Sequence, residues 1–190
     1  MKISAVLLAG GDSRRMGEDK ATLLFRGRPL WEIQLQLLRK LKPTEILVSA
    51  RADPPWRPDD VQFVADVPPS RGPLSGLAAS LAHMHSEHLL ALAIDMPLMS
   101  EVCLRLLCAQ IKPGRGVLPM IGDRAEPLAA IYPANAHVDL VEALSGIDFS
   151  LQRLTSKLVK ARKLLALKVG KESEVLFRSL NDPADLNLAQ

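Results

Sequence analysis

Short hydrophobic runs alternate along the chain with longer segments in which hydrophobic residues recur every three or four positions. Residues 3–9 and 89–94 form almost wholly apolar runs, which are typical of strands buried on both faces of a parallel sheet. The same reasoning predicts further strands, which span residues 45–50, 61–65, 117–121, 128–132 and 164–169. Glycine, proline and charged residues separate these runs, as expected for the turns of an α/β protein.

The intervening segments have helical spacing. In residues 30–41, leucine or isoleucine stands at positions 30, 33, 37, 38 and 41, which places these side chains on one helical face. Further helices are predicted at residues 74–84, 136–144 and 151–160. Another helix should begin directly after Ser100, which can cap it, and a last short helix should begin at Asp182–Pro183. A short extended piece is expected at residues 21–25, followed by a turn at 26–29.

This alternation of strands and helices has no internal repeat and no evident linker. It predicts a three-layer α/β fold in which helices cover both faces of a mostly parallel sheet. At 190 residues the chain is long enough to build one full core, so we expect a single domain over residues 1–190.

Composition narrows the possible partners. Lysine and arginine number 24 against 21 acidic residues, and the resulting formal charge of +3 is too small to indicate nucleic-acid binding. Aromatic residues make up only 4%, and Trp31 and Trp56 lack the interleaved aromatics of a base-stacking platform. The group His83, His85 and His88 lacks a second cluster of metal ligands, so we expect a solvated helix end there rather than zinc.

The sequence also indicates a compartment. The longest uncharged run, residues 72–86, is too short and too polar to span a bilayer, so no membrane association is expected. The apolar run at residues 3–9 leads into Gly-Gly-Asp rather than into a small-residue cleavage site. Cys103 and Cys108 lie five positions apart within one helix-like stretch, where they cannot easily pair. These features predict a reduced, cytoplasmic protein.

Polar or glycine residues follow several of the predicted strands. Gly10, Ser49, Asp66 and Asp95 all stand at strand ends, and ligands of open parallel sheets bind beyond the carboxyl ends of strands. A carboxylate held at the tip of a buried strand suits Mg²⁺, which prefers oxygen ligands and keeps several waters. The alternative for Asp95 is a structural role, capping the turn before Pro97.

The first predicted strand opens into a basic loop. At Gly10–Gly11 the missing side chains let backbone N–H groups approach a ligand, and Arg14, Arg15 and Lys20 add cations that can contact phosphates. The glycine spacing matches neither the P-loop nor the dinucleotide-binding motif. The loop therefore predicts a nucleotide site of another kind, unless its charges only face solvent.

Residues 8–20 read Leu-Ala-Gly-Gly-Asp-Ser-Arg-Arg-Met-Gly-Glu-Asp-Lys. This segment resembles the signature LAGGxSxRMGxDK of the small nucleotidyltransferases, and in particular of the molybdenum cofactor guanylyltransferases. Further along the chain, Asp95-Met96-Pro97 is similar to the D-x-P metal site of that family. Residues 72–76 match its GPLxG segment, and Asn181 stands in a segment similar to its terminal N-x-P.

The resemblance implies a Rossmann-like nucleotidyltransferase that moves GMP from GTP to the terminal phosphate of molybdopterin, depends on Mg²⁺ and releases pyrophosphate. It implies catalytic roles for Lys20, Arg15 and Asp95, with Asp95 as the metal ligand. The nucleotide-binding residues implied are Leu8, Ala9, Gly10, Gly11, Lys20, Ser49, Asp66, Gly72, Leu74, Gly76 and Asp95. GTP and molybdopterin are the expected partners, together with transient contacts to other proteins of cofactor biosynthesis.

Two alternatives remain open at this point. One is a cytidylyltransferase acting on molybdopterin or on a sugar or alcohol phosphate, and the other is a nucleotide-binding module without catalysis. Adjacent Gly10 and Gly11 favour guanylyl transfer, since related cytidylyltransferases often carry Ala-Ala-Gly there. Ser49 departs from the family pattern, in which some members have asparagine. Lys20 together with Asp95 argues against a purely binding role, because binding alone requires no rigid metal carboxylate.

Overall fold

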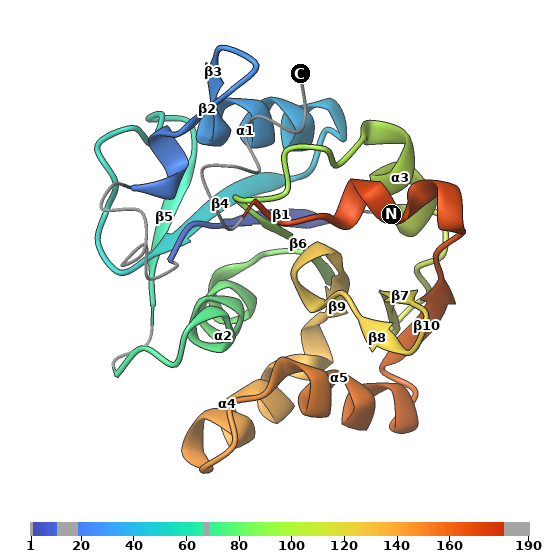
Figure 1. Ribbon diagram of the computed structural model, residues 1–190. Coiled ribbons are helices and arrows are strands. Elements are labelled where there is room, and N and C mark those ends of the chain that lie inside the picture. Colours follow the sequence, from blue (N-terminus) through green and yellow to red (C-terminus); the bar gives the residue numbers. More distant parts are fainter. Residues whose placement is uncertain (1, 11–18, 67–68, 181–190) are drawn as a thin grey trace.

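The computed structural model describes residues 2–10, 19–66 and 69–180. Its centre is an eight-stranded sheet in the order β10-β7-β9-β6-β1-β4-β5, with β8 against β7, and β2 and β3 form a separate ribbon (Figure 1). The strands are β1 (Ser4–Leu8), β2 (Leu24–Phe25), β3 (Arg28–Pro29), β4 (Glu45–Ala50), β5 (Gln62–Ala65), β6 (His88–Ala93), β7 (Gly116–Ile121), β8 (Arg124–Ala125), β9 (Ile131–Pro133) and β10 (Leu164–Lys168).

The sheet is mostly parallel, as the sequence predicted. Strand β1 pairs in parallel with β4 on one side and with β6 on the other, and β4 continues in parallel to β5. Strand β9 runs antiparallel between β6 and β7, and β10 is parallel to β7. The chain therefore proceeds from β1 outward to β5 and then returns to the other side of β1 with β6. Such a reversal opens a crevice at the carboxyl ends of the strands.

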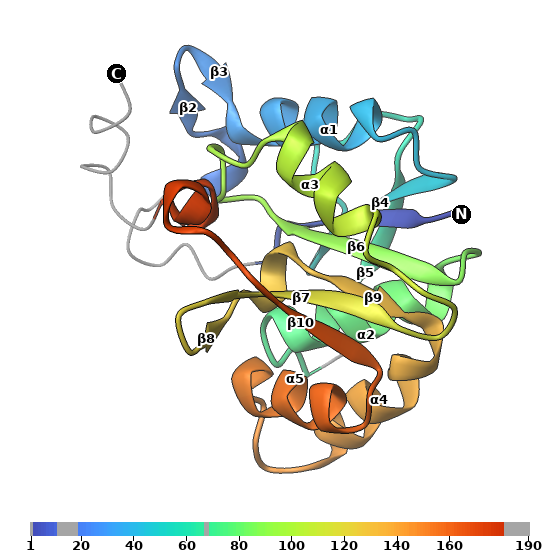
Figure 2. The ribbon, with the colours of Figure 1, turned by 90° about the vertical axis from the view of Figure 1, so that its right-hand side faces the viewer.

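Helices cover both faces of the sheet (Figures 1 and 2). Helices α1 (Leu30–Lys40) and α3 (Glu101–Cys108) lie on one face, and α2 (Pro73–His83), α4 (His137–Ser145) and α5 (Leu151–Lys160) on the other. Short 3₁₀ helices complete the connections: η1 (Lys20–Thr22), η2 (Pro127–Ala129), η3 (Ala134–Ala136) and η4 (Lys171–Phe177). Ser100 caps α3 as predicted, and its hydroxyl accepts a hydrogen bond from the backbone N–H of Cys103.

Side-chain alternation along the central strands divides the core in two. In β1, Ala5 and Leu7 pack with the residues of α1 and α3, whereas Val6 and Leu8 pack with those of α2, α4 and α5. Every side chain of β1 is buried, because both faces of this strand are covered by helices. The strand is thereby held rigidly, and its carboxyl end provides a fixed support for the residues that follow.

Three sequence-based expectations differ from the structure. The extended piece expected at residues 21–25 begins instead within η1 and is a strand only at β2, and residues 127–129 form η2 before the short strand β9 begins. Helical spacing predicts one buried face for residues 74–84, but α2 is buried nearly all round from Leu74 to Leu81, because it packs against both the sheet and α4. The helix expected at Asp182–Pro183 lies outside the described residues.

The histidine group is a solvated helix end only in part, because His83, the last residue of α2, and His85 are exposed whereas His88 is not. His88 is fully buried as the first residue of β6, and its Nε2 lies 3.1 Å from the carbonyl oxygen of Lys112. His85 is paired with Glu45. Within residues 2–10, 19–66 and 69–180, no cluster of three or more histidine, cysteine or acidic residues could hold a metal ion. The tertiary structure thus separates histidines that are close in sequence.

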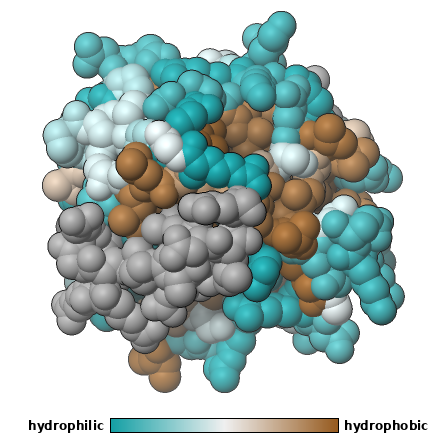
Figure 3. Space-filling view, turned by 45° about the horizontal axis from the view of Figure 1, so that its top comes forward, coloured by the Kyte–Doolittle hydropathy of each residue, from teal (hydrophilic) through white to brown (hydrophobic). Residues whose placement is uncertain are grey.

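The surface shown in Figure 3 combines hydrophobic and hydrophilic areas. In the view of Figure 3, hydrophobic atoms form separate patches among larger hydrophilic areas. No helix in the described part of the chain combines the length and the hydropathy needed to cross a bilayer. Cys103 and Cys108 are both free thiols, each partly buried in α3.

Candidate functional site

A pocket lies at the carboxyl ends of the central parallel strands, where the chain reverses direction across the sheet. Its walls come from the residues that follow β1, β4, β5 and β6, from the start of α2 and from η2. The lining residues are Leu8, Ala9, Gly10, Lys20, Ser49, Asp66, Gly72, Pro73, Gly76, Ala93, Ile94, Asp95 and Leu128. This is the position at which open parallel sheets bind their ligands.

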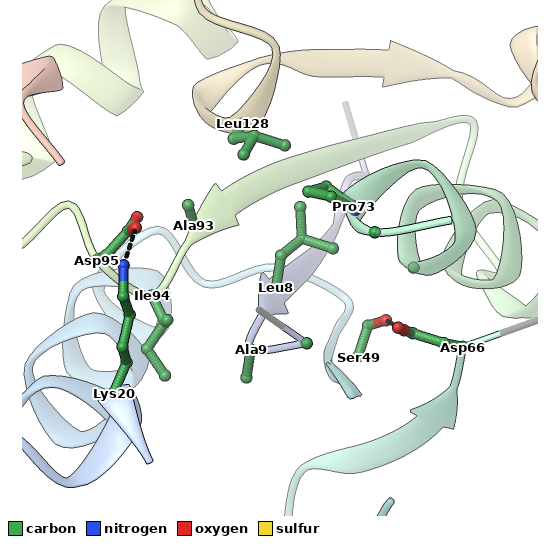
Figure 4. A pocket seen from close by; sticks show the side chains of 13 residues that line it. Leu8, Ala9, Lys20, Ser49, Asp66, Pro73, Ala93, Ile94, Asp95 and Leu128 are labelled. Atoms are coloured by element: carbon green, nitrogen blue, oxygen red, sulfur yellow. Dashed lines mark hydrogen bonds and ion pairs between the residues drawn. The ribbon is translucent and has the colours of Figure 1, made fainter. Parts of the chain in front are cut away.

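One end of the pocket carries an ion pair between Lys20 and Asp95 (Figure 4). The Nζ of Lys20 lies 3.2 Å from Oδ2 of Asp95, and both side chains are about one-fifth exposed. Lys20 also donates to the carbonyl oxygen of Leu180, at 3.2 Å, while the backbone N–H of Leu180 donates to the carbonyl of Asp95, at 2.8 Å. Segments from both ends of the chain therefore fix this corner of the pocket.

Asp66 occupies the other end, and its carboxylate is held by two hydroxyls. Ser49 donates to Oδ1 at 2.9 Å and Ser70 donates to Oδ2 at 3.1 Å. The residue is buried, with 7% of its surface exposed. Burial of a carboxylate is costly unless hydrogen bonds compensate it, and the two hydroxyls supply such bonds. Each oxygen keeps a further lone pair that can accept a hydrogen bond from a ligand.

Two glycines leave room for this arrangement. A Cβ added to Gly10 would lie 2.9 Å from Oδ2 of Asp66, and one added to Gly76 would lie 2.5 Å from Oγ of Ser49. Any side chain at either position would displace the Ser49–Asp66 pair or fill the pocket. The requirement for glycine here is one of space, because neither residue adopts a positive φ.

Apolar side chains separate the two polar ends. Leu8, Pro73 and Leu128 converge on the middle of the pocket in Figure 4, and Ile94 lies beside the Lys20–Asp95 pair. The extension of β6 beyond Ala93 stays next to β1 because the N–H of Ile94 donates to the carbonyl of Leu8, at 3.1 Å. An elongated cavity that is charged at both ends and apolar between them suits a ligand with a flat ring and an ionic tail.

The donor set at Asp95 fits Mg²⁺. It offers one partly exposed carboxylate, and the residues that the structure describes form no group of three or more histidine, cysteine or acidic side chains that could hold a metal. Mg²⁺ is commonly bound through one or two carboxylates, with waters and substrate phosphates completing its octahedron. A transition metal that demands several nitrogen or sulfur ligands would not be satisfied here.

The structure brings most of the sequence-predicted site residues together. The pocket is lined by Leu8, Ala9, Gly10, Lys20, Ser49, Asp66, Gly72, Gly76 and Asp95. Leu74, by contrast, is buried in the core against the sheet and does not line the pocket. Gly11 and Arg15 lie outside the described residues, so their roles remain predictions.

Four further residues line the pocket that were not predicted from the sequence, namely Pro73, Ala93, Ile94 and Leu128. Ala93 and Ile94 were expected only as strand residues, although their place beside Asp95 could have indicated the pocket wall. Leu128 is less obvious, because the apolar run 128–132 was interpreted as a strand. Pro127 was the available signal, since proline favours the first position of a turn or helix.

The sequence is similar to those of two curated relatives. A probable molybdenum cofactor guanylyltransferase of Opitutus terrae is 33% identical over 186 residues, covering 96% of this chain and 92% of the relative. A molybdenum cofactor guanylyltransferase of Xanthomonas euvesicatoria is 42% identical over 144 residues, covering 75% and 71%.

Solved structures show the same fold at lower identity. Molybdopterin-guanine dinucleotide biosynthesis protein A of Archaeoglobus fulgidus superposes with a TM-score of 0.73 at 24% identity, over 98% of this chain and 96% of the other. A 2-C-methyl-D-erythritol 4-phosphate cytidylyltransferase of Thermus thermophilus gives 0.71 at 19% identity, over 100% and 97%. The family model of the MobA-like NTP transferase domain matches residues 5–163. The chain therefore belongs to the family of MobA-like NTP transferase domains, and its pocket lies where that fold and the nucleotide motif predict a nucleotide.

Proposed function

We propose that the protein is a molybdenum cofactor guanylyltransferase, which transfers GMP from GTP to the terminal phosphate of molybdopterin and releases pyrophosphate, within one nucleotidyltransferase domain. The observation that carries the proposal is the pocket itself, in which the Lys20–Asp95 pair and the Asp66 carboxylate stand at opposite ends. The relatives named as guanylyltransferases support the choice of reaction.

In this proposal the nucleotide lies along the pocket with its phosphates toward Lys20. The backbone at Ala9 and Gly10 contacts the nucleotide, because Gly10 has no side chain to hold it away. The ammonium of Lys20 binds phosphate oxygens through charge-assisted hydrogen bonds. Arg15, outside the described residues, is proposed as a second cation at the same end.

The base occupies the end formed by Ser49 and Asp66. The carboxylate of Asp66 offers only acceptors, and guanine presents N1–H and an exocyclic 2-amino group as adjacent donors. Adenine would instead turn its N1 acceptor toward the carboxylate. The buried position of Asp66 strengthens this discrimination, because an unpaired polar group there is costly.

Transfer requires no covalent enzyme intermediate. An oxygen of the acceptor phosphate forms a bond to the α-phosphorus of GTP, and the bond from that phosphorus to the pyrophosphate oxygen breaks on the opposite side. Lys20 stabilises the charge that accumulates on the leaving pyrophosphate, and the rigid strand ends hold the reacting groups in line. Asp95, which lines the pocket, would hold Mg²⁺ through its carboxylate. When bound there, Mg²⁺ would supply charge neutralisation and orientation of the phosphates.

The deciding experiment compares the four nucleoside triphosphates directly. The purified protein is incubated with Mg²⁺, molybdopterin and GTP, CTP, ATP or UTP in turn, and the products are identified by mass spectrometry. We expect the guanylyl adduct and stoichiometric pyrophosphate with GTP only. A cytidylyl adduct would contradict guanylyl transfer, and nucleotide binding without any turnover would reduce the chain to a binding module.

A further inference from the structure

The two tryptophans of the chain lie against each other, next to the end of the predicted nucleotide loop. Trp31 stands in the first turn of α1, and Trp56 stands in the proline-rich connection between β4 and β5. Their ring centroids are 5.8 Å apart and their planes differ by 15°, so the indoles are stacked. Both side chains are partly buried, and Trp31 and Trp56 pack against the core beneath α1.

Trp56 also holds Asp19. Its indole N–H donates to Oδ2 of Asp19 at 2.9 Å, while Oδ1 of the same carboxylate accepts the backbone N–H of Ala21 at 3.0 Å. Asp19 is the N-cap of η1, the three-residue turn that begins with Lys20. One carboxylate therefore connects a stacked indole to the helical turn that directs Lys20 into the pocket.

Thr22 also holds the beginning of this turn, since its backbone N–H and its hydroxyl donate to the carbonyl oxygen of Asp19 at 3.0 and 2.9 Å. A 3₁₀ turn of three residues has weak internal hydrogen bonding. Ala21, the second residue of the turn, is buried in the core. Asp19, which directly precedes the turn, is solvent-exposed, and its carboxylate accepts the hydrogen bond from Trp56. The loop that contains Trp56 can act as a support, because Arg57 bridges it internally with bonds of 2.6 and 2.8 Å to Asp53.

We propose that Trp56, supported by its stack on Trp31, is a positioning residue that sets Lys20 for the phosphates through Asp19. The proposal rests on the proposed function for the role of Lys20. Trp56 itself does not line the pocket, so it acts only through the turn. The consequence is that a change at an indole nitrogen outside the pocket alters how the protein binds a triphosphate.

The test uses two matched substitutions. Trp56→Phe keeps an aromatic ring for the stack but removes the donor to Asp19, whereas Trp31→Phe makes the same chemical change in the other ring. We expect Trp56→Phe to weaken GTP·Mg²⁺ affinity about three- to tenfold, the effect of losing one ordinary hydrogen bond, because the indole acts on the phosphates only through the turn. Trp31→Phe should stay near wild type. No change in Trp56→Phe, or an equal loss in both variants, would overturn the proposal.

A second variant separates positioning from general stability. In Asp19→Asn one oxygen remains to cap η1, but the amide group then faces the indole N–H, so affinity should fall as in Trp56→Phe. In a Lys20→Ala background, neither substitution should weaken GTP·Mg²⁺ binding further. A loss of the same size in that background would show that Trp56 acts by another route and would overturn the proposal.

The contact can also be measured without any nucleotide. Because the chain has only two tryptophans, the Trp31→Phe protein emits from Trp56 alone. Adding Asp19→Ala should shift that emission, since the indole loses its carboxylate partner. An unchanged spectrum would contradict the positioning contact, whereas failure of the wild-type protein to bind GTP would contradict the proposed function instead.

Discussion

Lys20 and Asp95 form an ion pair of 3.2 Å although 75 residues separate them in the sequence. The pair brings a cation and an anion to one corner of the pocket, at the carboxyl end of β6. A metal–nucleotide complex presents both charges as well, with its phosphates negative and its metal positive. Lys20 and Asp95 can therefore exchange their mutual contact for two complementary contacts with the substrate.

Replacing Lys20 by alanine should weaken GTP·Mg²⁺ binding or transition-state stabilisation by about 1.5–3 kcal/mol, the range for a charge-assisted hydrogen bond. Calorimetry and steady-state kinetics measure the two effects. Lys40→Ala, at an exposed position of α1, is the matched control and should change neither. Full activity in Lys20→Ala would exclude a phosphate-binding role for this residue.

Asp95→Asn keeps the size of the side chain and can still accept the hydrogen bond from Lys20, but it loses the negative charge. We expect metal-dependent turnover to fall by orders of magnitude, with a smaller fall in GTP affinity, because the pocket otherwise stays intact. Asparagine caps turns about as well as aspartate. Near-normal turnover would therefore identify Asp95 as a structural residue, and Asp123→Asn in the exposed β7–β8 turn is the control.

Asp66 is expected to select the base. Inosine triphosphate lacks only the 2-amino group of GTP, so the ratio of the two affinities reports the contact between this group and the carboxylate. The wild-type protein should prefer GTP about tenfold or more, the value of one hydrogen bond to a charged group. In Asp66→Asn the ratio should approach one. An unchanged ratio would place the 2-amino group elsewhere.

Gly76→Ala tests the spacing beneath the pocket. Alanine in a helix interior normally stabilises by up to about 1 kcal/mol relative to glycine. Here the added methyl group would lie 2.5 Å from Oγ of Ser49, so we expect destabilisation of about 1–3 kcal/mol and weaker nucleotide binding. Gly146→Ala is the control, because its methyl group would meet the nearest atom at 3.4 Å. Denaturant unfolding of both variants measures the difference.

Glu45 predicts a pH dependence of stability. Burial raises the pKa of its carboxyl, but hydrogen bonds from the Ser4 hydroxyl and from the backbone and ring of His85 outweigh burial, so the pKa lies below its usual value of 4.5. A lowered pKa in the folded state gives stability that is present above the unfolded-state pKa and is lost as pH falls through the folded value.

We therefore expect Glu45→Gln to lower the melting temperature at pH 7. The difference from wild type should narrow as the pH falls below the usual glutamate pKa of 4.5 and through the lower pKa of the folded state, because the carboxylate of the wild-type protein then becomes protonated. Glu142→Gln, at an exposed position of α4, should show no such difference. A gap that stays constant down to pH 3 would contradict the stabilising role of the ionised carboxylate.

The parallel core was predictable from local pattern alone. The ranges 45–50 and 151–160 were predicted to the residue, the first from a short and mainly apolar run and the second from helical spacing. The segment around Leu128 was not, because its apolar run gave no sign that Pro127 starts a separate 3₁₀ turn. His88 was misplaced for a related reason, since its burial depends on carbonyl groups 24 and 27 positions later.

The site could be predicted in part. The glycines, Lys20 and Asp95 stand at strand ends and within a motif, so the sequence alone identified them. The bond from Trp56 to Asp19 and the contact of Lys20 with Leu180 depend on tertiary structure, with separations of 37 and 160 residues. No periodicity within a window of the sequence carries that information.

The contact between Lys20 and Leu180 joins residues that the ribosome adds at very different times. During synthesis Lys20 leaves the ribosome long before Leu180 is made, so the sheet can form while this corner of the pocket is still incomplete. The corner closes only when the last described residues dock onto the carbonyl of Asp95. All described strands end before residue 169, so the nascent chain contains every one of these strands before it contains the residue that completes this corner.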